Sequence, residues 1–343
     1  MHHYGKIIFC MNTTAESGAI TPPRLFASLK AGFDAVASHI GLILFPVALD
    51  ALLWFGYHLR IKTWLMPMVD SYLKLSKLSS TAELKTLLET SKQTWQTIAE
   101  SFNLVIFIRS YPLGIPSLIS GLQPTTTPLG VPPVIDFQSA WGSAGFMVLF
   151  TLVGIILGAQ YFFMVARVAN RDTEHVATRD IFAVLWQVLL FNLVFYGVVV
   201  LVSLPILMIV TIIIMLSPAL GQLVLVAVVF IVAWLSLPLI FSTHGIFTYR
   251  QPFRASLATS IRLGRYAGPQ IAMFAVVILI LGTGMNMLWA VPSADSWLLL
   301  IGIAGHAFVS TALLAGSFIY YRSAVRWVQE VIQHRLAAQK PPV

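Results

Sequence analysis

The sequence predicts an all-α fold, a polytopic membrane helix bundle with six transmembrane helices. Of its 343 residues, 58% are hydrophobic and 10% are charged, and the mean hydropathy is +0.84. The 61 residues of 181–241 include no Asp, Glu, Lys, Arg or His. A membrane-spanning helix needs about 20 apolar residues, whereas no soluble core demands continuous apolarity of that length. The composition and this apolar block together exclude a soluble globular protein.

The amino-terminal part is predicted to contain a disordered segment, an interfacial helix and the first span. We expect residues 1–20 to be disordered, because they hold no apolar run long enough for a signal peptide. Thr21 followed by Pro22 is typical of a helix start. Apolar residues then recur every three or four positions, which indicates an amphipathic interfacial helix. It leads into a span at 40–57, so that the unit covers 21–57.

Residues 58–140 are predicted to form an extracytoplasmic cap that is mostly helical. The spacing of Ser80 and Glu83 matches a capping box, and apolar residues follow at helical intervals. Six prolines lie within 112–133, which excludes regular helix there. We expect the cap to end in an extended proline-rich strap.

The second span is predicted at 141–166. Gly154 and Gly158 give it a face of small residues, on which another helix can approach closely in lipid. We expect this face to pack within the bundle; homodimerisation is the alternative. The nearby Gly142-Ser143-Ala144-Gly145 lacks the context of a serine nucleophile, so we attribute its small residues to packing too.

The apolar block 181–241 is predicted to form a hairpin of two spans, 181–216 and 223–241, joined by a turn at 217–222. A straight helix over 181–216 would be about 54 Å long, well beyond the hydrocarbon core of about 30 Å. We therefore expect Pro205 to kink or break the helix.

The carboxy-terminal part is predicted to hold a second interfacial helix, two spans and a tail. Pro252 suits the first turn of a helix in which apolar residues share one face and arginines share another. We expect this helix at 250–266, the spans at 270–289 and 297–321, and the tail at 322–343.

The distribution of basic residues predicts the orientation. Of the 21 Lys and Arg residues, three precede the first predicted span, three lie between the second and third, four between the fourth and fifth, and four follow the sixth. All fourteen lie on one side of a six-span protein, and the short turns on the other side carry none. The positive-inside rule makes that side cytoplasmic. We expect an inner (plasma) membrane protein with both termini in the cytoplasm.

Few residues are candidates for catalysis or for binding a metal or cofactor. The sequence contains no metal-ligand pair at helical spacing, P-loop, dinucleotide fingerprint or nucleophile elbow, so we expect no catalytic residue, metal or cofactor. Asp50 is the only acidic residue within a predicted span, and His306 lies in the last one. Both are candidate intramembrane polar positions, since ionisable groups in a membrane are costly. The structural alternatives are that Asp50 reaches water or pairs with the cap, and that His306 hydrogen-bonds between helices.

Four arginines near the fifth span are candidate contacts for anionic lipid headgroups. A basic side chain near a charged membrane surface contributes about 1 kcal/mol to binding. Topogenic charge is the alternative interpretation. Nucleic acid is not an expected partner, because the basic residues lie in short segments between apolar helices. The four candidates are Arg250, Arg254, Arg262 and Arg265.

The basic helix that enters the fifth span, Pro252 to Arg265, and the Tyr320-Tyr321-Arg322 sequence that ends the sixth resemble a known pattern. They look like the bacterial six-helix membrane proteins related to the membrane domain of glycerophosphodiester phosphodiesterases. The resemblance covers 181–335 and implies a six-helix membrane fold. The catalytic domain of those enzymes has no counterpart here, and the long segment after the first span departs from their compact pattern. No catalytic residue is carried over.

These observations lead to the hypothesis of a non-enzymatic integral membrane protein, an accessory or scaffold subunit that contacts lipids or a protein partner, or forms a homo-oligomer. The alternative is a permease-like subunit for a small or lipidic substrate, with a pocket near Asp50. A polar cavity that reaches Asp50 or His306 would favour the permease, and a bundle filled by side chains would exclude it. A membrane enzyme has the least support, because no site constellation is visible.

Overall fold

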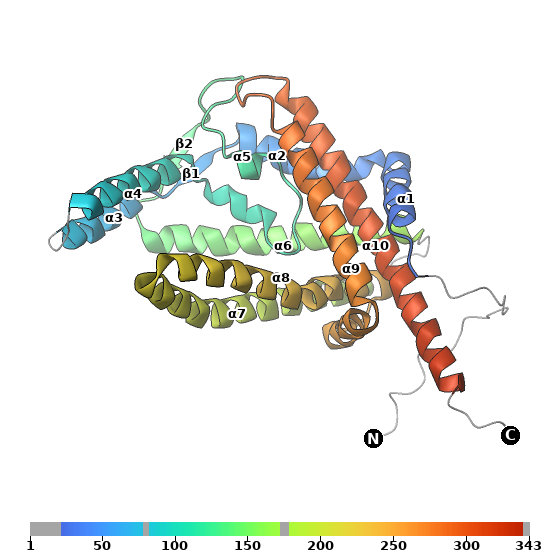
Figure 1. Cartoon of the computed structure of the whole chain (residues 1–343). Helices are drawn as coiled ribbons and strands as arrows, with labels where there is room; N and C mark the ends of the chain where they lie inside the picture. Colours follow the sequence, from blue (N-terminus) through green and yellow to red (C-terminus); the bar gives the residue numbers. More distant parts are fainter. Residues whose placement is uncertain (1–21, 78–81, 172–177, 339–343) are drawn as a thin grey trace.

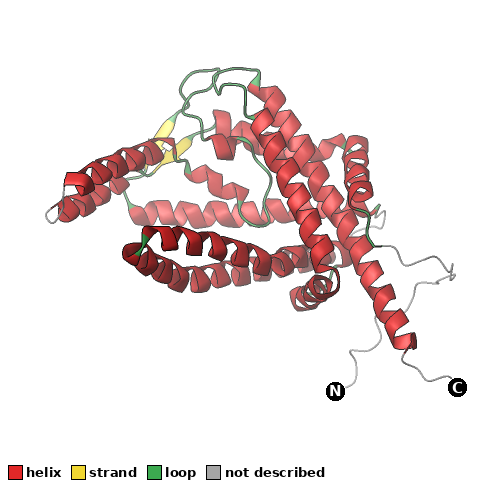
Figure 2. Ribbon diagram, in the orientation of Figure 1, coloured by secondary structure: helices red, strands yellow, loops and turns green. Residues whose placement is uncertain are grey.

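The computed structural model describes residues 22–77, 82–171 and 178–338. Over these ranges the chain is almost entirely helical, apart from one two-stranded sheet (Figure 2). The prediction of an all-α fold is confirmed. The predicted disordered segment 1–20 lies outside the described residues.

Five helices of the described ranges are long and apolar enough to cross a membrane, which supports a multi-pass membrane protein. A sixth span exists only if the two helices at the amino terminus count as one broken span. The sixth span, the kind of membrane and the orientation therefore stay predictions. The five helices are α6 (Ala140–Asn170), α7 (Thr178–Leu216), α8 (Pro218–Tyr249), α9 (Phe253–Trp289) and α10 (Leu299–Ala338).

The amino-terminal helices are sharply bent relative to each other. A bend of 92° separates α1 (Leu25–Ser38) from the next part, which comprises the 3-10 helix η1 (Ile40–Ile43) and α2 (Leu44–Phe55). The apolar side of α1, predicted to face lipid headgroups, is covered by α10. The two backbones approach so closely that a Cβ on Gly32 would overlap the Gly316 nitrogen. A glycine at position 32 is therefore a requirement of this packing.

The long helices form two crossed groups rather than one parallel bundle. Figure 1 shows α6, α7 and α8 running side by side, while α9 and α10 cross them steeply. Buried aromatic residues, including Phe162, Phe191 and Phe318, fill the region where the groups meet. A polar contact also joins the groups, since the hydroxyls of Tyr161 in α6 and Thr311 in α10 lie 2.8 Å apart.

The α7–α8 hairpin differs from its prediction at the turn. Only Ser217 separates the helices, so the predicted turn at 217–222 is wrong. Ser217 accepts a hydrogen bond from the Leu220 amide at 3.5 Å, and Pro218 opens α8, so the new helix starts at once. α7 continues as helix through Pro205 to Leu216, so Pro205 does not break it, and the predicted kink stays a prediction. Proline is tolerated inside membrane helices, where neighbouring groups take over the freed carbonyl.

α9 consists of two helical segments that meet at Ala267. This residue has non-helical dihedrals, φ −127° and ψ 20°, and Pro269 follows closely. The bend lies at the predicted junction between 250–266 and 270–289. α10 continues as helix beyond the predicted span, so the part of the tail up to Ala338 is helical.

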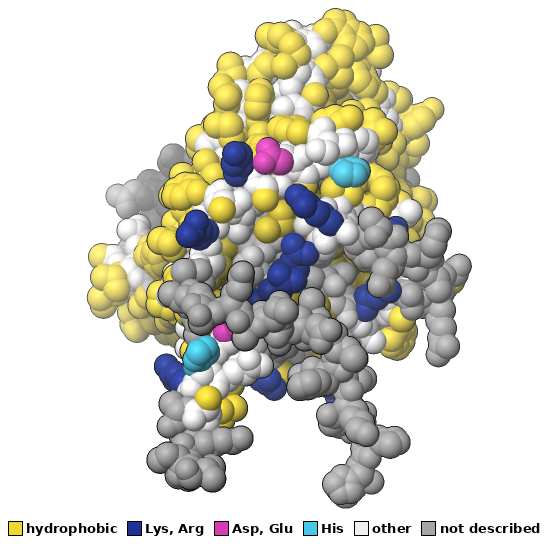
Figure 3. All heavy atoms as spheres, turned by 90° about the vertical axis from the view of Figure 1, so that its right-hand side faces the viewer, with side chains coloured by type: hydrophobic (Ala, Val, Ile, Leu, Met, Phe, Trp, Pro, Cys, Tyr) yellow, Lys and Arg dark blue, Asp and Glu magenta, His cyan; other side chains and the backbone are white. Residues whose placement is uncertain are grey.

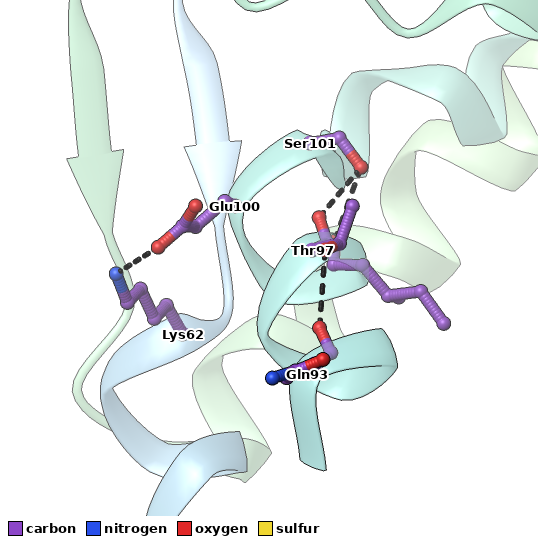
Figure 4. Close-up of polar contacts among 6 residues, drawn as sticks. Lys62, Gln93, Thr97, Glu100 and Ser101 are labelled. Carbon is purple, nitrogen blue, oxygen red and sulfur yellow. Dashed lines mark hydrogen bonds and ion pairs between the residues drawn. The ribbon is translucent and has the colours of Figure 1, made fainter. Parts of the chain in front are cut away.

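The segment after α2 begins as a small helical unit. The strand β1 (His58–Arg60) pairs in parallel with β2 (Val134–Asp136), and between them lie α3 (Lys62–Lys77) and α4 (Ala82–Ser101). An ion pair of 2.7 Å joins Lys62 to Glu100, which ties the start of α3 to the end of α4 (Figure 4). The Lys62 hydrogen bond holds the pKa of the Glu100 carboxyl below its ordinary value. These elements agree with a mostly helical unit, and its extracytoplasmic location stays a prediction.

The proline-rich part of the predicted cap does not lie outside the bundle. Residues 104–122, called the inserted segment, include the 3-10 helix η2 (Leu104–Arg109) and the short helix α5 (Ile119–Leu122). Their apolar side chains, such as Leu113 and Leu118, are buried in the main core with α2 and α6. The expectation of an external strap is wrong for this part, because burying these apolar side chains outweighs the cost of placing irregular backbone inside.

Candidate functional site

Asp50 lies on α2 and holds the inserted segment in place. Its side chain is fully buried, at 0% exposure, so the expectation that it reaches water is wrong. Its carboxylate accepts hydrogen bonds from the Ser117 hydroxyl, from the Leu118 amide at 3.0 Å and from the Ile119 amide at 3.1 Å. The amides belong to the first turn of α5, whose donors have no helical partner. The pairing of Asp50 with the predicted cap is thus observed, as an internal helix cap.

Arg109 supplies the positive charge of this buried region. Its guanidinium donates to the Ser120 hydroxyl at 2.6 Å and lies over the Tyr111 ring, 4.8 Å from its centre. Its charge acts on both Asp50 and His306, so the inserted segment brings the two candidate intramembrane positions into one electrostatic environment.

His306 lies on α10 and is half-buried. Its Nε2 atom has no hydrogen-bond partner among the described residues, so the predicted bond between helices is not found at this atom.

The two glycines of α6 contact the inserted segment rather than another helix. A Cβ on Gly154 would overlap the Ile108 carbonyl oxygen, and one on Gly158 would lie 2.7 Å from the Leu113 carbonyl oxygen. The prediction that this face packs within the protein is confirmed. Its partner differs from the expectation, because irregular backbone occupies the space that the small residues leave.

The four candidate lipid contacts lie on and before the first part of α9. Residues 253–266, called the basic segment, bury Phe253 and Leu263 against the protein. The arginines at 254, 262 and 265 are exposed, so they form an outward face. Arg250 differs from them, since it is half-buried and ends α8 in a left-handed conformation.

Contacts at its start fix the basic segment to two other helices. The Gln187 side chain of α7 accepts a hydrogen bond from the Phe253 amide at 2.9 Å. The Ser256 hydroxyl donates to the Ser242 carbonyl of α8. These contacts hold the start of the basic segment against α7 and α8.

Two cavities are found among the described residues, and neither is lined by Asp50 or His306. The smaller, of about 250 Å³, lies beside the basic segment and includes Arg265 in its lining. The larger, called the interhelical cavity, has a volume of about 670 Å³ and is bounded by the α1–α2 bend, α6 and α7. The condition that would favour a permease, a polar cavity reaching Asp50 or His306, is therefore not met by these two cavities.

Comparison of the chain with protein-family models, with curated proteins and with solved structures finds no match. The predicted resemblance to the membrane domain of glycerophosphodiester phosphodiesterases stays an expectation.

Sequence reasoning missed two features of these sites. It did not single out Arg109, whose guanidinium contacts the Ser120 hydroxyl and the Tyr111 ring. It counted Arg167 and Arg171 only for orientation, whereas both line the interhelical cavity. The bend between α1 and α2, which closes one side of that cavity, carried no local signal that we recognised.

Proposed function

We propose that this chain is a non-enzymatic accessory or scaffold protein of the membrane, and that it binds anionic lipid through the basic segment. One observation carries the proposal. The segment buries its apolar side against the protein while Arg254, Arg262 and Arg265 face outward together. A row of guanidinium groups on a fixed helix attracts anionic headgroups, with about 1 kcal/mol per basic residue near the surface.

The test is lipid retention in native mass spectrometry. The full chain in mild detergent is mixed with phosphatidylglycerol or phosphatidylcholine vesicle lipid, and bound lipids are counted. Replacing Arg254, Arg262 and Arg265 by Gln is expected to lower phosphatidylglycerol retention by about tenfold or more, since three charges are lost. Phosphatidylcholine retention is expected to stay unchanged.

A matched control removes the same charge elsewhere. Replacing Lys74, Lys77 and Lys85 by Gln also removes three positive charges, but from the segment after α2. This variant is expected to retain phosphatidylglycerol as the unchanged protein does. Equal loss in both variants would indicate a net-charge effect and would contradict a role of the basic segment.

The accessory role also implies a protein partner or a second copy of the chain. A pull-down of the full chain from mild detergent tests this part of the proposal. Recovery of a stoichiometric second subunit, or of a defined homo-oligomer, is expected. Recovery of a monomer that transports a small solute in vesicles would instead favour the permease alternative.

A further inference from the structure

The interhelical cavity has walls of two kinds. Its volume of about 670 Å³ falls in the range of sites that bind small molecules, which is about 300–1,000 Å³. Leu42, Phe163, Val184 and Leu185 contribute apolar surface from three different elements, while Arg167 lies in the last turn of α6 and Arg171 directly follows the helix as its C-cap. An occupant that suits both kinds of wall is amphipathic, with a negative end.

The polar and apolar parts are arranged along the axis of α6. Ile156 lines one end of the cavity, and Arg167 lies eleven residues further on, toward the end of the helix. At 1.5 Å per residue this separation is about 16 Å, close to half of the hydrocarbon core of about 30 Å. The apolar wall therefore has the depth of one membrane leaflet, with the basic side chains at its edge.

Positive charge converges on this edge from a second helix. Arg322 of α10 donates to the Asn170 carbonyl at 3.0 Å, at the end of α6. It lies close enough to Arg171 and Arg326 for their charges to act on it. None of the thirteen described residues that line the cavity is acidic. Like charges held together repel, and an anion bound among them relieves that repulsion.

Figure 3 shows the same side of the molecule, the right-hand side of Figure 1. Lys and Arg side chains gather across its middle and lower parts, below a largely hydrophobic region. This face therefore carries basic side chains that can attract an anionic group.

We infer that the interhelical cavity binds one anionic glycerophospholipid from the bilayer, with its phosphate at Arg167 and Arg171 and one acyl chain along the apolar wall of α6 and α7. This site lies apart from the basic segment, so the inference goes beyond the proposed function and does not rest on it. The basic segment presents an open face to many headgroups, whereas the cavity has room for the phosphate and one chain of a single lipid.

Native mass spectrometry of the full chain tests the inference by stoichiometry. After delipidation in detergent, titration with phosphatidylglycerol is expected to show one lipid retained at collision energies that remove the others. The variant Arg171→Gln loses a charged hydrogen-bond donor and is expected to bind this lipid about tenfold more weakly. The variant Arg171→Lys keeps the charge and is expected to recover part of the affinity.

A second variant tests the apolar wall. Ile156→Trp places a larger side chain at the exposed apolar end of the cavity and is expected to lower the retained fraction several-fold without changing charge. Leu201→Trp, on a lipid-facing part of α7, is its matched control and is expected to retain the lipid. Thermal unfolding in detergent verifies that each variant is folded. If Ile156→Trp unfolds, the variant Met164→Trp is used instead. Lipid with one brominated chain should then quench the tryptophan fluorescence of this variant more than that of the unchanged protein.

Three outcomes would overturn the inference. These are equal retention of phosphatidylcholine, full displacement by inorganic phosphate, which would show a site for a free anion, and retention unchanged in both Arg171→Gln and Ile156→Trp. The triple change at Arg254, Arg262 and Arg265 separates the two proposals. It should remove the loosely held lipids and leave the single tightly bound lipid. A negative result for the basic segment can therefore be distinguished from a negative result for the cavity.

Discussion

The α7–α8 hairpin and the inserted segment are both apolar in sequence, yet their backbone hydrogen-bonding groups are satisfied in different ways. The hairpin is continuous helix, which satisfies its own amides, and its side chains are largely exposed, with Leu201 at 75% and Phe230 at 72%. The inserted segment consists of two short helices, η2 and α5, joined by irregular backbone, and it is enclosed by protein. In lipid every backbone polar group needs a partner, so only the helical region can face the bilayer.

The polar side chains follow the same division. Ser117 and Asp50 satisfy the irregular backbone of the inserted segment, and the Tyr196 hydroxyl of α7 donates to the Tyr111 carbonyl at 2.5 Å. Along most of the exposed hairpin, polar side chains only bond to their own helix, as Thr211 does to the Leu207 carbonyl. The comparison teaches that in these two regions the polar side chains that bond across the protein lie where the backbone leaves regular helix.

Among the changes that test this comparison, removing the Asp50 carboxylate is expected to cause the largest loss of stability. Asp50→Ala leaves three donors unsatisfied in a buried site, so we expect a loss of about 3–5 kcal/mol in the free energy of unfolding. Denaturant unfolding in detergent measures it. Asp50→Asn keeps one acceptor oxygen and should lose less. Wild-type stability of Asp50→Ala would show that the inserted segment is held by apolar burial alone.

The second-largest effect is expected for the glycines of α6, which contact the inserted segment. Gly154→Ala places a Cβ against the Ile108 carbonyl oxygen, and we expect a loss of about 1–3 kcal/mol in thermal or denaturant unfolding. Gly145→Ala lies on the same helix with nothing within 4 Å and serves as the matched control. If Gly154→Ala changed the oligomeric state in size-exclusion chromatography but not the stability, this result would contradict packing within the protein and favour dimerisation.

The smallest expected effect concerns the hairpin. Leu201→Ala removes a side chain that contacts lipid in folded and unfolded states alike, so the free energy of unfolding should change by less than about 0.5 kcal/mol. Leu113→Ala, in the inserted segment at 1% exposure, is the control and should cost about 2–5 kcal/mol. Similar losses in the two variants would mean that a partner or second copy covers the hairpin.

Much of the helix pattern was predictable because it depends on local signals. Ser139 caps α6 by accepting a hydrogen bond from the Gly142 amide at 3.4 Å, and the bend at Ala267 precedes Pro269. Both are consequences of residues within one or two turns. Pro205 does not break α7, since a proline that would end a helix in water is tolerated in a membrane where neighbouring groups satisfy the freed carbonyl.

The candidate sites were predictable only in part. Asp50 was identified because an acidic residue within an apolar helix is costly, but its partners lie 67 to 69 residues away in the chain. The arginines of the basic segment follow from helical periodicity. The interhelical cavity needs the ends of α6 and α7 beside the α1–α2 bend, which no periodicity indicates.

The sequence by itself determined the all-α class, the long apolar helices and the side of each helix that carries charge, because hydropathy and helical period are properties of neighbouring residues. The tertiary structure alone decided that the inserted segment, with the first part of the proline-rich region, enters the core, that α9 and α10 cross the other long helices, and that Arg167 and Arg171 border a cavity. The physical reason is distance along the chain. Packing joins residues whose separation leaves no local pattern, and only complementary shape and charge select their partners.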